Sequence, residues 1–322
     1  MKKNKIKITT IGGGSGQYAL LSGLRDVENI DITAIVSMVD SGGSTGRLRD
    51  ELGVLPPGDI LKCILALSSN REHARRILQK RFRGENKLNG HSVGNMLLTI
   101  LSSYAGSFPE GVKALGEVLC ARGEVLPVTT DKATLAAELT DGTHLYGETA
   151  IDIPRGDQRE KIRKTFLVPH HGQEIKVHPP VITAIRQTDY IIIGPGDLYT
   201  SITPNFLVSG VKEALKKSKA EIIYVVNVMT KFGETDNFRG EDFILKLEDF
   251  IERKIDKAIF NSACPPKNIL EKYRTQKANL VELPEKKFFS KRNIIMGDVL
   301  SIAGGIIRHD SKKLAKIIKE II

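Results

Sequence analysis

Residues 6–16 are Ile-Lys-Ile-Thr-Thr-Ile-Gly-Gly-Gly-Ser-Gly. Apolar Ile6, Ile8 and Ile11 alternate with polar residues, with one extra threonine before Ile11, and glycine and serine follow at once. The alternating part predicts a β-strand. The glycines after it predict a loop that leads into a helix, where backbone N–H groups favour an anion. A strand followed by such a loop is typical of a wound α/β sheet, which binds ligands at the carboxyl ends of its strands.

Three further stretches have the apolar composition of strands in a parallel sheet, namely 30–39, 190–193 and 222–226. Between and after them, apolar residues recur at helical spacing over 93–101, 207–215, 243–251 and 314–321. Asp310 or Ser311 is placed to cap the last of these helices. This alternation of strands and helices predicts an α/β fold with a wound sheet.

Residues 125–180 have a different pattern, with short alternating pieces at 135–139, 144–147 and 174–178 around a charged segment. We expect them to form a small β-rich insertion or subdomain.

Each of the four expected strands ends in a glycine-rich or polar loop, at 12–16, 40–47, 194–201 and 227–230. In a parallel sheet these loops lie along one edge, where the usual ligand crevice is found. Glycine lets a ligand approach the backbone closely, and loop N–H groups favour an anion. Four such loops together indicate a ligand that carries phosphate.

Several common nucleotide and catalytic motifs are absent from these loops. The first loop has Gln17 where a dinucleotide-binding loop needs its third glycine, and the second lacks the Gly-Lys-Ser/Thr ending of a P-loop. Ser15 does not sit in a G-x-S-x-G elbow and is expected to be a helix cap or a phosphate donor. The histidines and the three cysteines lack metal-binding spacing, and we expect the cysteines to lie in the core.

Individual polar residues near the loops allow two interpretations each. Asp40 is either a metal or acid–base residue or an Asx-turn residue that holds its loop. Asp59 is expected to cap a helix over 60–67. Arg47 and Lys62 are placed either to bind phosphate or to lie on the surface, and His91 either to bind phosphate or sugar or to cap a helix.

The composition limits the partners of the chain. Its 322 residues carry a net charge of +10, but the lysines lie in runs typical of solvated faces. The chain has no Trp and no aromatic–basic interleaving, which argues against nucleic acid. Three scattered cysteines fit a reducing compartment, and no apolar run reaches the length of a membrane span, so we expect a cytoplasmic protein with no membrane partner.

The ordered motifs resemble those of the YvcK-type gluconeogenesis factors in the CofD-like superfamily, which also contains the 2-phospho-L-lactate transferases. They are Gly-Gly-Gly-Ser-Gly at 12–16, Asp-Ser-Gly-Gly-Ser-Thr-Gly-Arg-Leu-Arg at 40–49, Leu-Pro-Pro-Gly-Asp at 55–59, Gly-His-Ser-Val-Gly-Asn at 90–95, Gly-Pro-Gly-Asp-Leu-Tyr-Thr-Ser at 194–201 and Asn-Val-Met-Thr-Lys-Phe-Gly-Glu-Thr-Asp at 227–236. The resemblance covers nearly the whole chain.

The resemblance implies one domain over 1–322 with a Rossmann-like α/β/α fold of three layers, a mainly parallel sheet and the insertion at 125–180. It also implies a homodimer that binds UDP-N-acetylglucosamine or a related UDP-sugar and acts with a protein partner in amino-sugar synthesis. Such a regulator would support cell-envelope precursor supply and cell shape during gluconeogenic growth. The glycine loops would hold the diphosphate, Tyr273 the uridine end, and Arg308 would lie near the nucleotide-sugar.

The loops and the resemblance together give the residues expected to bind the ligand: Gly12, Gly13, Gly14, Ser15, Gly16, Asp40, Gly43, Ser44, Thr45, Arg47, Lys62, His91, Asn95, Gly194, Gly196, Asp197, Ser201, Asn227, Thr230, Tyr273 and Arg308.

The alternative to a regulator without catalytic activity is a transferase of nucleotidyl or phospho groups that uses Mg²⁺, with Asp40 as its metal ligand. The chain departs from the family pattern at two positions. Many relatives have two aspartates where this chain has Asp40-Ser41, which weakens a two-carboxylate metal site and so the transferase. Lys62 stands where Arg is common, which keeps the charge but loses the bidentate fork of an arginine. We therefore expect no required cofactor in the regulator, and Mg²⁺ only in the transferase.

Overall fold

The structure is a computed structural model that describes residues 5–85, 87–172, 174–290 and 292–322. Its centre is a parallel seven-stranded sheet with the strand order β10-β9-β8-β7-β1-β2-β3. The strands are β1 (Ile6–Gly12), β2 (Ile30–Val36), β3 (Glu124–Pro127), β7 (Tyr190–Ile193), β8 (Glu221–Val225), β9 (Lys257–Asn261) and β10 (Asn293–Gly297). The sheet confirms the expected α/β fold of Rossmann-like type.

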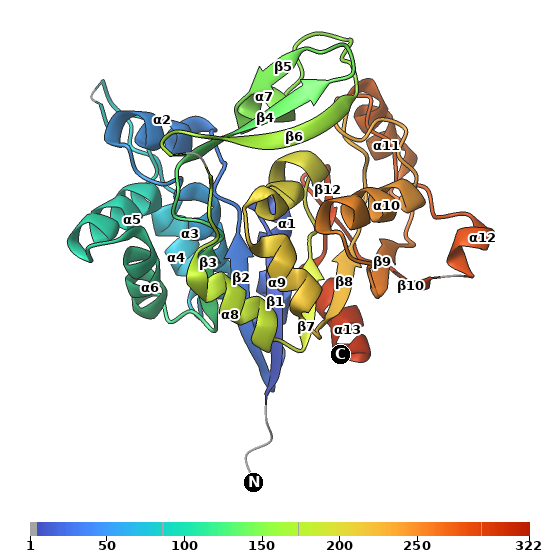
Figure 1. The fold of residues 1–322 in the computed structure, drawn as a ribbon, viewed down its shortest axis with the longest axis horizontal. Helices are drawn as coiled ribbons and strands as arrows, with labels where there is room; N and C mark the ends of the chain where they lie inside the picture. The colour runs from blue at the N-terminus through green and yellow to red at the C-terminus, as the bar shows by residue number, and fades with distance from the viewer. Residues whose placement is uncertain (1–4, 86, 173, 291) are drawn as a thin grey trace.

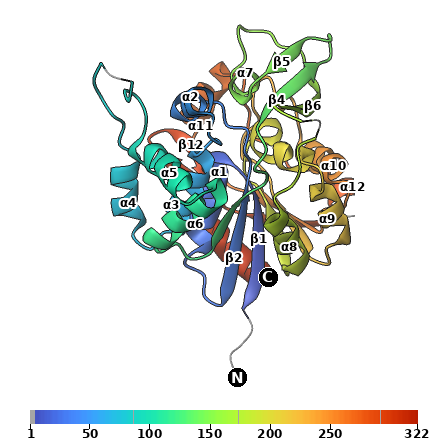
Figure 2. The same ribbon diagram turned by 60° about the vertical axis from the view of Figure 1, so that its left-hand side comes forward.

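Helices cover both faces of this sheet and complete three layers (Figures 1 and 2). One face carries α1 (Gly14–Leu24), α3 (Gly58–Leu67) and α13 (Ser311–Ile321), and the other carries α8 (Pro179–Gln187), α9 (Val211–Lys217) and α10 (Gly240–Ile251). The side chains of Leu20, Leu21 and Leu24 in α1 are at most 1% exposed. At the start of α13, Asp310 accepts hydrogen bonds from the N–H groups of Lys312 and Lys313, which confirms one of the two expected caps.

An outer group of helices packs against α3. It consists of α4 (Arg71–Leu78), α5 (Val93–Tyr104) and α6 (Phe108–Val118). This second cover explains why α3 is apolar nearly all round, with Ile60, Ile64 and Leu67 fully buried. The short α2 (Gly43–Leu52) follows the second sheet loop, and α11 (Lys267–Thr275) and α12 (Lys286–Phe289) lie at the β9–β10 end of the molecule (Figure 1).

The expected insertion contains a separate antiparallel sheet with the strand order β5-β4-β6. Its elements are β4 (Ala133–Leu139), β5 (His144–Tyr146), α7 (Glu148–Asp152) and β6 (Ile162–Pro169). It lies above the carboxyl ends of the central strands (Figure 1). Both ends of 125–180 belong to other parts of the fold, because β3 pairs with β2 and α8 begins at Pro179.

Two expectations from the sequence are wrong. The piece 174–178 forms only an isolated bridge between Lys176 and Ser209, and the prolines that start α8 follow directly. Of the cysteines only Cys63 is buried. Cys120 is exposed in the turn after α6, and Cys264 is exposed in the loop before Pro265. Apolar neighbours in sequence did not predict burial because both residues lie in surface turns.

Two short helices and a hairpin complete the fold. The π-helix η1 (Leu198–Ile202) and the 3₁₀-helix η2 (Thr203–Leu207) follow the loop after β7, and the hairpin of β11 (Leu300–Ala303) and β12 (Ile306–His309) precedes α13. No helix of the described chain combines the length and the apolar character needed to cross a membrane.

Candidate functional site

A cleft of about 890 Å³ opens at the carboxyl edge of the central sheet. Its walls are the loops after β1, β7 and β8, the helix α7 of the insertion, and the hairpin residues around Arg308. This is the position predicted from the four loops, and the volume is in the range of small-molecule sites.

The first wall is the start of α1, which faces the cleft with Gly13, Gly14, Ser15 and Gly16. Gly14 has a φ of +66°, a conformation that favours glycine. A Cβ at Gly16 would lie 2.1 Å from the carbonyl oxygen of Pro195, so only glycine lets the two loops meet. The first N–H groups of a helix have no carbonyl partner within the helix and carry its partial positive charge. The start of α1 is therefore suited to an anion.

A group of three carboxylates and one lysine lies beside this wall. Asp59 accepts hydrogen bonds from the N–H of Gly14 and from Lys62 Nζ, both at 2.8 Å. Burial and the neighbouring charge of Asp59 raise the pKa of Asp40. Burial, with the charges of Asp40 and Asp152, raises the pKa of Glu148 to about 7. Burial, the largest single effect, lowers the pKa of Lys62, but the neighbouring carboxylates Asp59 and Asp40 act against it and the net shift is upward.

Asp40 also holds its own loop. Its Oδ1 accepts the N–H of Gly42 at 2.9 Å, which is the Asx-turn interpretation of this residue. Asp40 lines the cleft at the same time, so the structure combines a turn role with a place in the site. The expectation that Asp59 caps α3 is wrong, because Pro57 is the N-cap and the Asp59 carboxylate points to α1 and Lys62.

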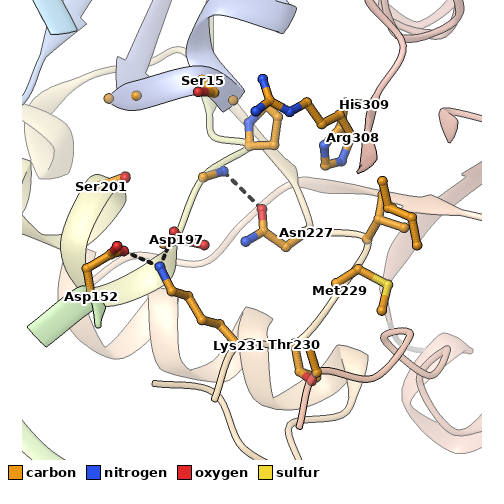
Figure 3. Close-up of a pocket in the computed structure, with 18 of the residues that line it drawn as sticks. Ser15, Asp152, Asp197, Ser201, Asn227, Met229, Thr230, Lys231, Arg308 and His309 are labelled. Carbon is orange, nitrogen blue, oxygen red and sulfur yellow. Dashed lines mark hydrogen bonds and ion pairs between the residues drawn. The ribbon is translucent and has the colours of Figure 1, made fainter. Parts of the chain in front are cut away.

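A second charged group surrounds Lys231 (Figure 3). Its Nζ bonds to Asp152, lies 2.7 Å from Asp197 and lies 3.4 Å from Glu234. Burial alone lowers the pKa of Lys231, but Asp197, Glu234 and Asp152 raise it well above its usual range. Burial raises the pKa of Glu234 to about 8, with Asp197 adding to the effect. Lys231 thus joins α7 of the insertion to the loop after β7.

A further part of the cleft wall is formed by neutral polar groups and one arginine. Asn227 Oδ1 accepts the N–H of Gly196 at 3.0 Å (Figure 3). The Tyr273 hydroxyl accepts the N–H of Ile307 at 2.8 Å and so fixes the strand that carries Arg308. His309 Nε2 bonds to the carbonyl of Val226 at 3.1 Å, and burial lowers the pKa of His309 to about 4. With its Nε2 donating to this carbonyl, His309 is neutral at physiological pH.

The structure brings together most of the residues predicted from the sequence. The predicted residues that line the cleft are Gly13, Gly14, Ser15, Gly16, Asp40, Lys62, Gly196, Asp197, Ser201, Asn227, Thr230, Tyr273 and Arg308. Their roles toward a ligand stay predictions.

The remaining predicted residues lie outside the cleft lining, and they are Gly12, Gly43, Ser44, Thr45, Arg47, His91, Asn95 and Gly194. Ser44 forms the centre of a buried polar network, with His91 Nδ1 at 3.1 Å and Asn95 Nδ2 at 3.2 Å. Arg47 donates to the carbonyls of Asn89 and Lys87. These side chains attach α2 to α5 and to the loop before it.

Sequence reasoning missed the charged residues Glu148, Asp152 and Lys231. Lys231 follows the recognised loop 227–230 directly, so its place one residue beyond a strand-end loop was a usable signal. Glu148 and Asp152 come from the insertion, and no local pattern places an insertion helix over the cleft.

The carboxylates of the cleft include one group with the spacing of a metal site. Oxygens of Asp152, Asp197 and Glu234 lie within 4.8 Å of one another. Lys231 already lies among them, and Lys62 bonds to Asp59 in the other group. A divalent cation at Asp152, Asp197 and Glu234 would have to displace Lys231, and Lys62 already neutralises Asp59 in the other group, so the residues as arranged do not fit Mg²⁺.

The comparisons with known proteins agree with this architecture. The family model described as 2-phospho-L-lactate transferase CofD matches residues 8–299. A protein of Thermotoga maritima is 40% identical to this chain, and the match covers 98% of the chain and 99% of the relative. The Bacillus subtilis protein named gluconeogenesis factor is 38% identical, with 99% and 98% covered.

A solved structure extends the agreement to three dimensions. A crystal structure of a Bacillus halodurans protein superposes with a TM-score of 0.90 at 36% identity, and the match covers 98% of this chain and 99% of that one. Fold, sequence and length all match along nearly the whole chain. The chain therefore belongs to the CofD family and, within it, to the gluconeogenesis factors of the YvcK type.

Proposed function

We propose that the protein binds a nucleotide-sugar, UDP-N-acetylglucosamine or a related UDP-sugar, and acts as a regulator that reports this occupancy. The ligand-bound state of the protein regulates a protein partner in amino-sugar synthesis. Through this partner it controls cell-envelope precursor supply and cell shape during gluconeogenic growth. The name of the Bacillus subtilis relative, gluconeogenesis factor, supports the metabolic setting. We also propose a cytoplasmic homodimer.

The observation that carries the proposal is the start of α1 at the cleft. Gly13, Gly14, Ser15 and Gly16 line it with a glycine backbone at a helix N-terminus. Because these N–H groups favour anions, the diphosphate of the ligand would lie here. Arg308 also lines the cleft and supplies a positive charge for the same group or for the nucleotide beside Tyr273.

The carboxylates suit the sugar end of such a ligand. Asp40, Asp59, Glu148, Asp152 and Asp197 all line the cleft. Ionised carboxylates accept hydrogen bonds from hydroxyl groups and repel phosphate, so this side of the cleft favours a sugar over a further phosphate. The two lysines reduce the repulsion within each carboxylate group.

Family membership keeps one alternative open, a Mg²⁺-dependent nucleotidyl or phospho-group transferase related to 2-phospho-L-lactate transferase. In that protein the carboxylates would hold the metal, which Lys62 and Lys231 oppose in the present arrangement. The regulator therefore agrees better with the charges of the cleft.

Calorimetric titration with UDP-N-acetylglucosamine, UDP and GDP, each with and without Mg²⁺, tests the proposal. We expect the UDP-sugar to bind most tightly and Mg²⁺ to leave its affinity unchanged. Arg308→Ala removes a charged contact and should weaken binding about 10- to 100-fold. Arg274→Ala is the matched control, because this exposed arginine on α11 lies outside the cleft lining.

Two results would overturn the proposal. Preference for GDP, or binding that requires Mg²⁺ and is lost in Asp40→Asn, would favour the transferase. If Arg308→Ala and Arg274→Ala bind the UDP-sugar with equal affinity, the cleft is not its binding site.

A further inference from the structure

Half of the net charge of the chain comes from one short segment. Between Arg71 and Lys87 the sequence has seven Arg and Lys residues and two Glu, in a chain of net charge +10. The composition as a whole suggested dispersed, solvated lysines. This segment differs because five of its seven cations are arginines: Arg71, Arg75, Arg76, Arg81 and Arg83.

The structure presents the segment as an ordered projection, which we call the basic arm and define as residues 71–85 and 87–89. It consists of α4 and the loop that follows, which stands at the edge of the molecule beside α2 (Figures 1 and 2). The base of the loop is a pair of hydrogen bonds between Phe82 and the residues His91 and Gly90, both at 2.9 Å, next to the bridge between Arg81 and Ser92. The arm is therefore held in shape by backbone pairing.

The charges of the arm face solvent. None of its Arg and Lys side chains forms an ion pair with a described carboxylate of the chain. Arg76, Lys80 and Arg83 are exposed. Unneutralised cations this close together repel one another, which a partner of opposite charge would relieve.

Apolar side chains are exposed among these charges. Ile77 on α4 is 59% exposed, and Phe82 in the loop is 37% exposed. Protein interfaces are enriched in arginine and aromatic residues and depleted in lysine, whereas single-stranded nucleic acid needs a platform of stacking aromatics. Phe82 is the single Phe, Tyr or Trp residue between Arg71 and Lys87.

We infer that the basic arm is the docking surface for a partner protein whose contact face combines Asp and Glu residues with an apolar pocket. The arginines would pair with the acidic residues, and Phe82 and Ile77 would fill the pocket. The charges set the rate of encounter and the partner choice, and the apolar anchors hold the complex.

The arm is joined to the cleft through α2. Asp40, which lines the cleft, holds the loop that starts α2 through Gly42. From α2, Arg47 donates to the carbonyls of Asn89 and Lys87 in the arm, at 2.6 and 3.0 Å. A ligand that shifts Asp40 would shift the start of α2, and with it Arg47, whose hydrogen bonds hold the arm. This coupling rests on the proposed function, whereas the docking surface itself does not.

A direct test uses fluorescence anisotropy with a short labelled peptide of alternating Glu and Leu, and a polyglutamate peptide of equal charge. The variant Arg76→Glu/Lys80→Glu/Arg83→Glu changes three exposed side chains, none of which forms an ion pair with a described carboxylate. The control Lys312→Glu/Lys316→Glu/Lys319→Glu makes the same change of charge on exposed positions of α13. We expect the arm variant to lose at least about tenfold in affinity for the Glu–Leu peptide, and the control to lose much less.

The apolar part of the inference is tested with Phe82→Ser. This variant should bind the Glu–Leu peptide more weakly and bind polyglutamate with unchanged affinity. A single-stranded RNA and vesicles of phosphatidylglycerol are measured in parallel. Tighter arm-dependent binding of RNA or vesicles would overturn the inference, and so would equal losses in the arm and control variants.

Adding UDP-N-acetylglucosamine separates the inference from the proposed function. If calorimetry detects no UDP-sugar binding while the arm variant still loses the peptide, the proposed function fails and the docking surface stands. If the sugar binds and changes the peptide affinity in the unsubstituted protein but not in Arg308→Ala, both are supported. If the UDP-sugar binds and the peptide does not, the docking surface is overturned and the proposed function stands.

Discussion

Glu148 shows how the cleft changes the chemistry of a single residue. Its carboxyl is partly buried near Asp40 and Asp152, which raises its pKa from 4.5 to about 7. In the unfolded chain the carboxyl ionises at its ordinary pKa, so the folded state binds more protons between these two values. Ionised Glu148 therefore costs stability, fully above about pH 7 and hardly at all below about pH 4.5.

Glu148→Gln should remove this cost and keep an acceptor oxygen. At about pH 8 we expect the variant to be more stable than the unsubstituted protein by about 1–2 kcal/mol, a value reduced for the partial exposure of the side chain. Near pH 4.5 the two should be equal. Chemical denaturation at both pH values measures the difference, and a stability gain that does not change with pH would contradict the assignment.

Lys231 is the residue that neutralises the second carboxylate group. Lys231→Met leaves Asp152, Asp197 and Glu234 facing one another and should cost about 1–3 kcal/mol of unfolding free energy. Adding Asp197→Asn should restore part of the loss. Because three carboxylates then lie close together without a cation, the single variant should also gain affinity for Mn²⁺.

Calorimetry with Mn²⁺ and denaturation measure these two effects. Lys272→Met is the control, since Lys272 is exposed on α11 and lies outside the cleft lining. Tight Mn²⁺ binding by the unsubstituted protein would show that the cation readily displaces Lys231. That result would favour the Mg²⁺-dependent transferase over the regulator.

At the scale of residues, sequence reasoning placed Asp40, Asn227 and the glycines Gly13, Gly14, Gly16 and Gly196 at the cleft because their position after a strand is a local property. It failed for Asp59, whose carboxylate turns away from the cap position toward Gly14 and Lys62. The orientation of this carboxylate depends on Gly14, which is distant in sequence, and no rule on residue spacing predicts it. The same holds for Asp152, which reaches Lys231 from the insertion.

At the scale of elements, the contact between the start of α1 and the loop after β7 determines the shape of the anion site. Gly16→Ala would place a Cβ 2.1 Å from the Pro195 carbonyl oxygen. The backbone must shift, so we expect a loss of about 1–3 kcal/mol in stability and at least about tenfold in UDP-sugar affinity.

Gly116→Ala is the control for this substitution. It lies within α6 with Ala121 Cβ as its nearest neighbour at 3.9 Å, so it should stabilise the protein by about 0.5–1 kcal/mol and leave binding unchanged. Thermal denaturation and calorimetry compare the two variants. Unchanged UDP-sugar binding in Gly16→Ala would contradict the placement of the diphosphate.

The central elements were predictable because strand and helix periods are strong in buried segments. The start of α1, the strand β7 and the cap of α13 match the sequence pattern. The piece 174–178 alternates like a strand and yet forms a single bridge, because its partner Ser209 belongs to a loop. Alternation alone cannot supply a partner strand.

At the scale of the whole molecule, contacts at two places on α7 hold the insertion over the cleft. Ser41 Oγ accepts the N–H of Thr149 at 3.0 Å, and Lys231 bonds to Asp152. Both contacts are made by α7, so a ligand in the cleft would lie between this helix and the central sheet.

Hydrogen–deuterium exchange should detect this arrangement. UDP-N-acetylglucosamine should slow exchange in α7 and in the first turn of α1, because the ligand contacts both walls. Exchange in α6, which lies in the outer helix group, should not change. Protection confined to α6, or absent from α7, would exclude the insertion from the site.

The sequence predicted a wound sheet and a separate β-rich segment, but not that this segment lies above the carboxyl edge. That position depends on contacts such as Ser41 with Thr149, made across more than a hundred residues of chain. The positive charge of the basic arm is contiguous in the sequence, and a judgement of the charge from the overall composition missed it. The structure adds that these cations form no ion pair with a described carboxylate.

X-ray diffraction from crystals grown with UDP-N-acetylglucosamine would show where the nucleotide-sugar binds. We predict electron density for the diphosphate against the N–H groups of Ser15 and Gly16, with the sugar beside Asp40 and Glu148 and the uridine beside Tyr273. Density for the nucleotide outside this cleft, or a diphosphate bound by the carboxylates through Mg²⁺ with Lys62 and Lys231 displaced, would contradict the account.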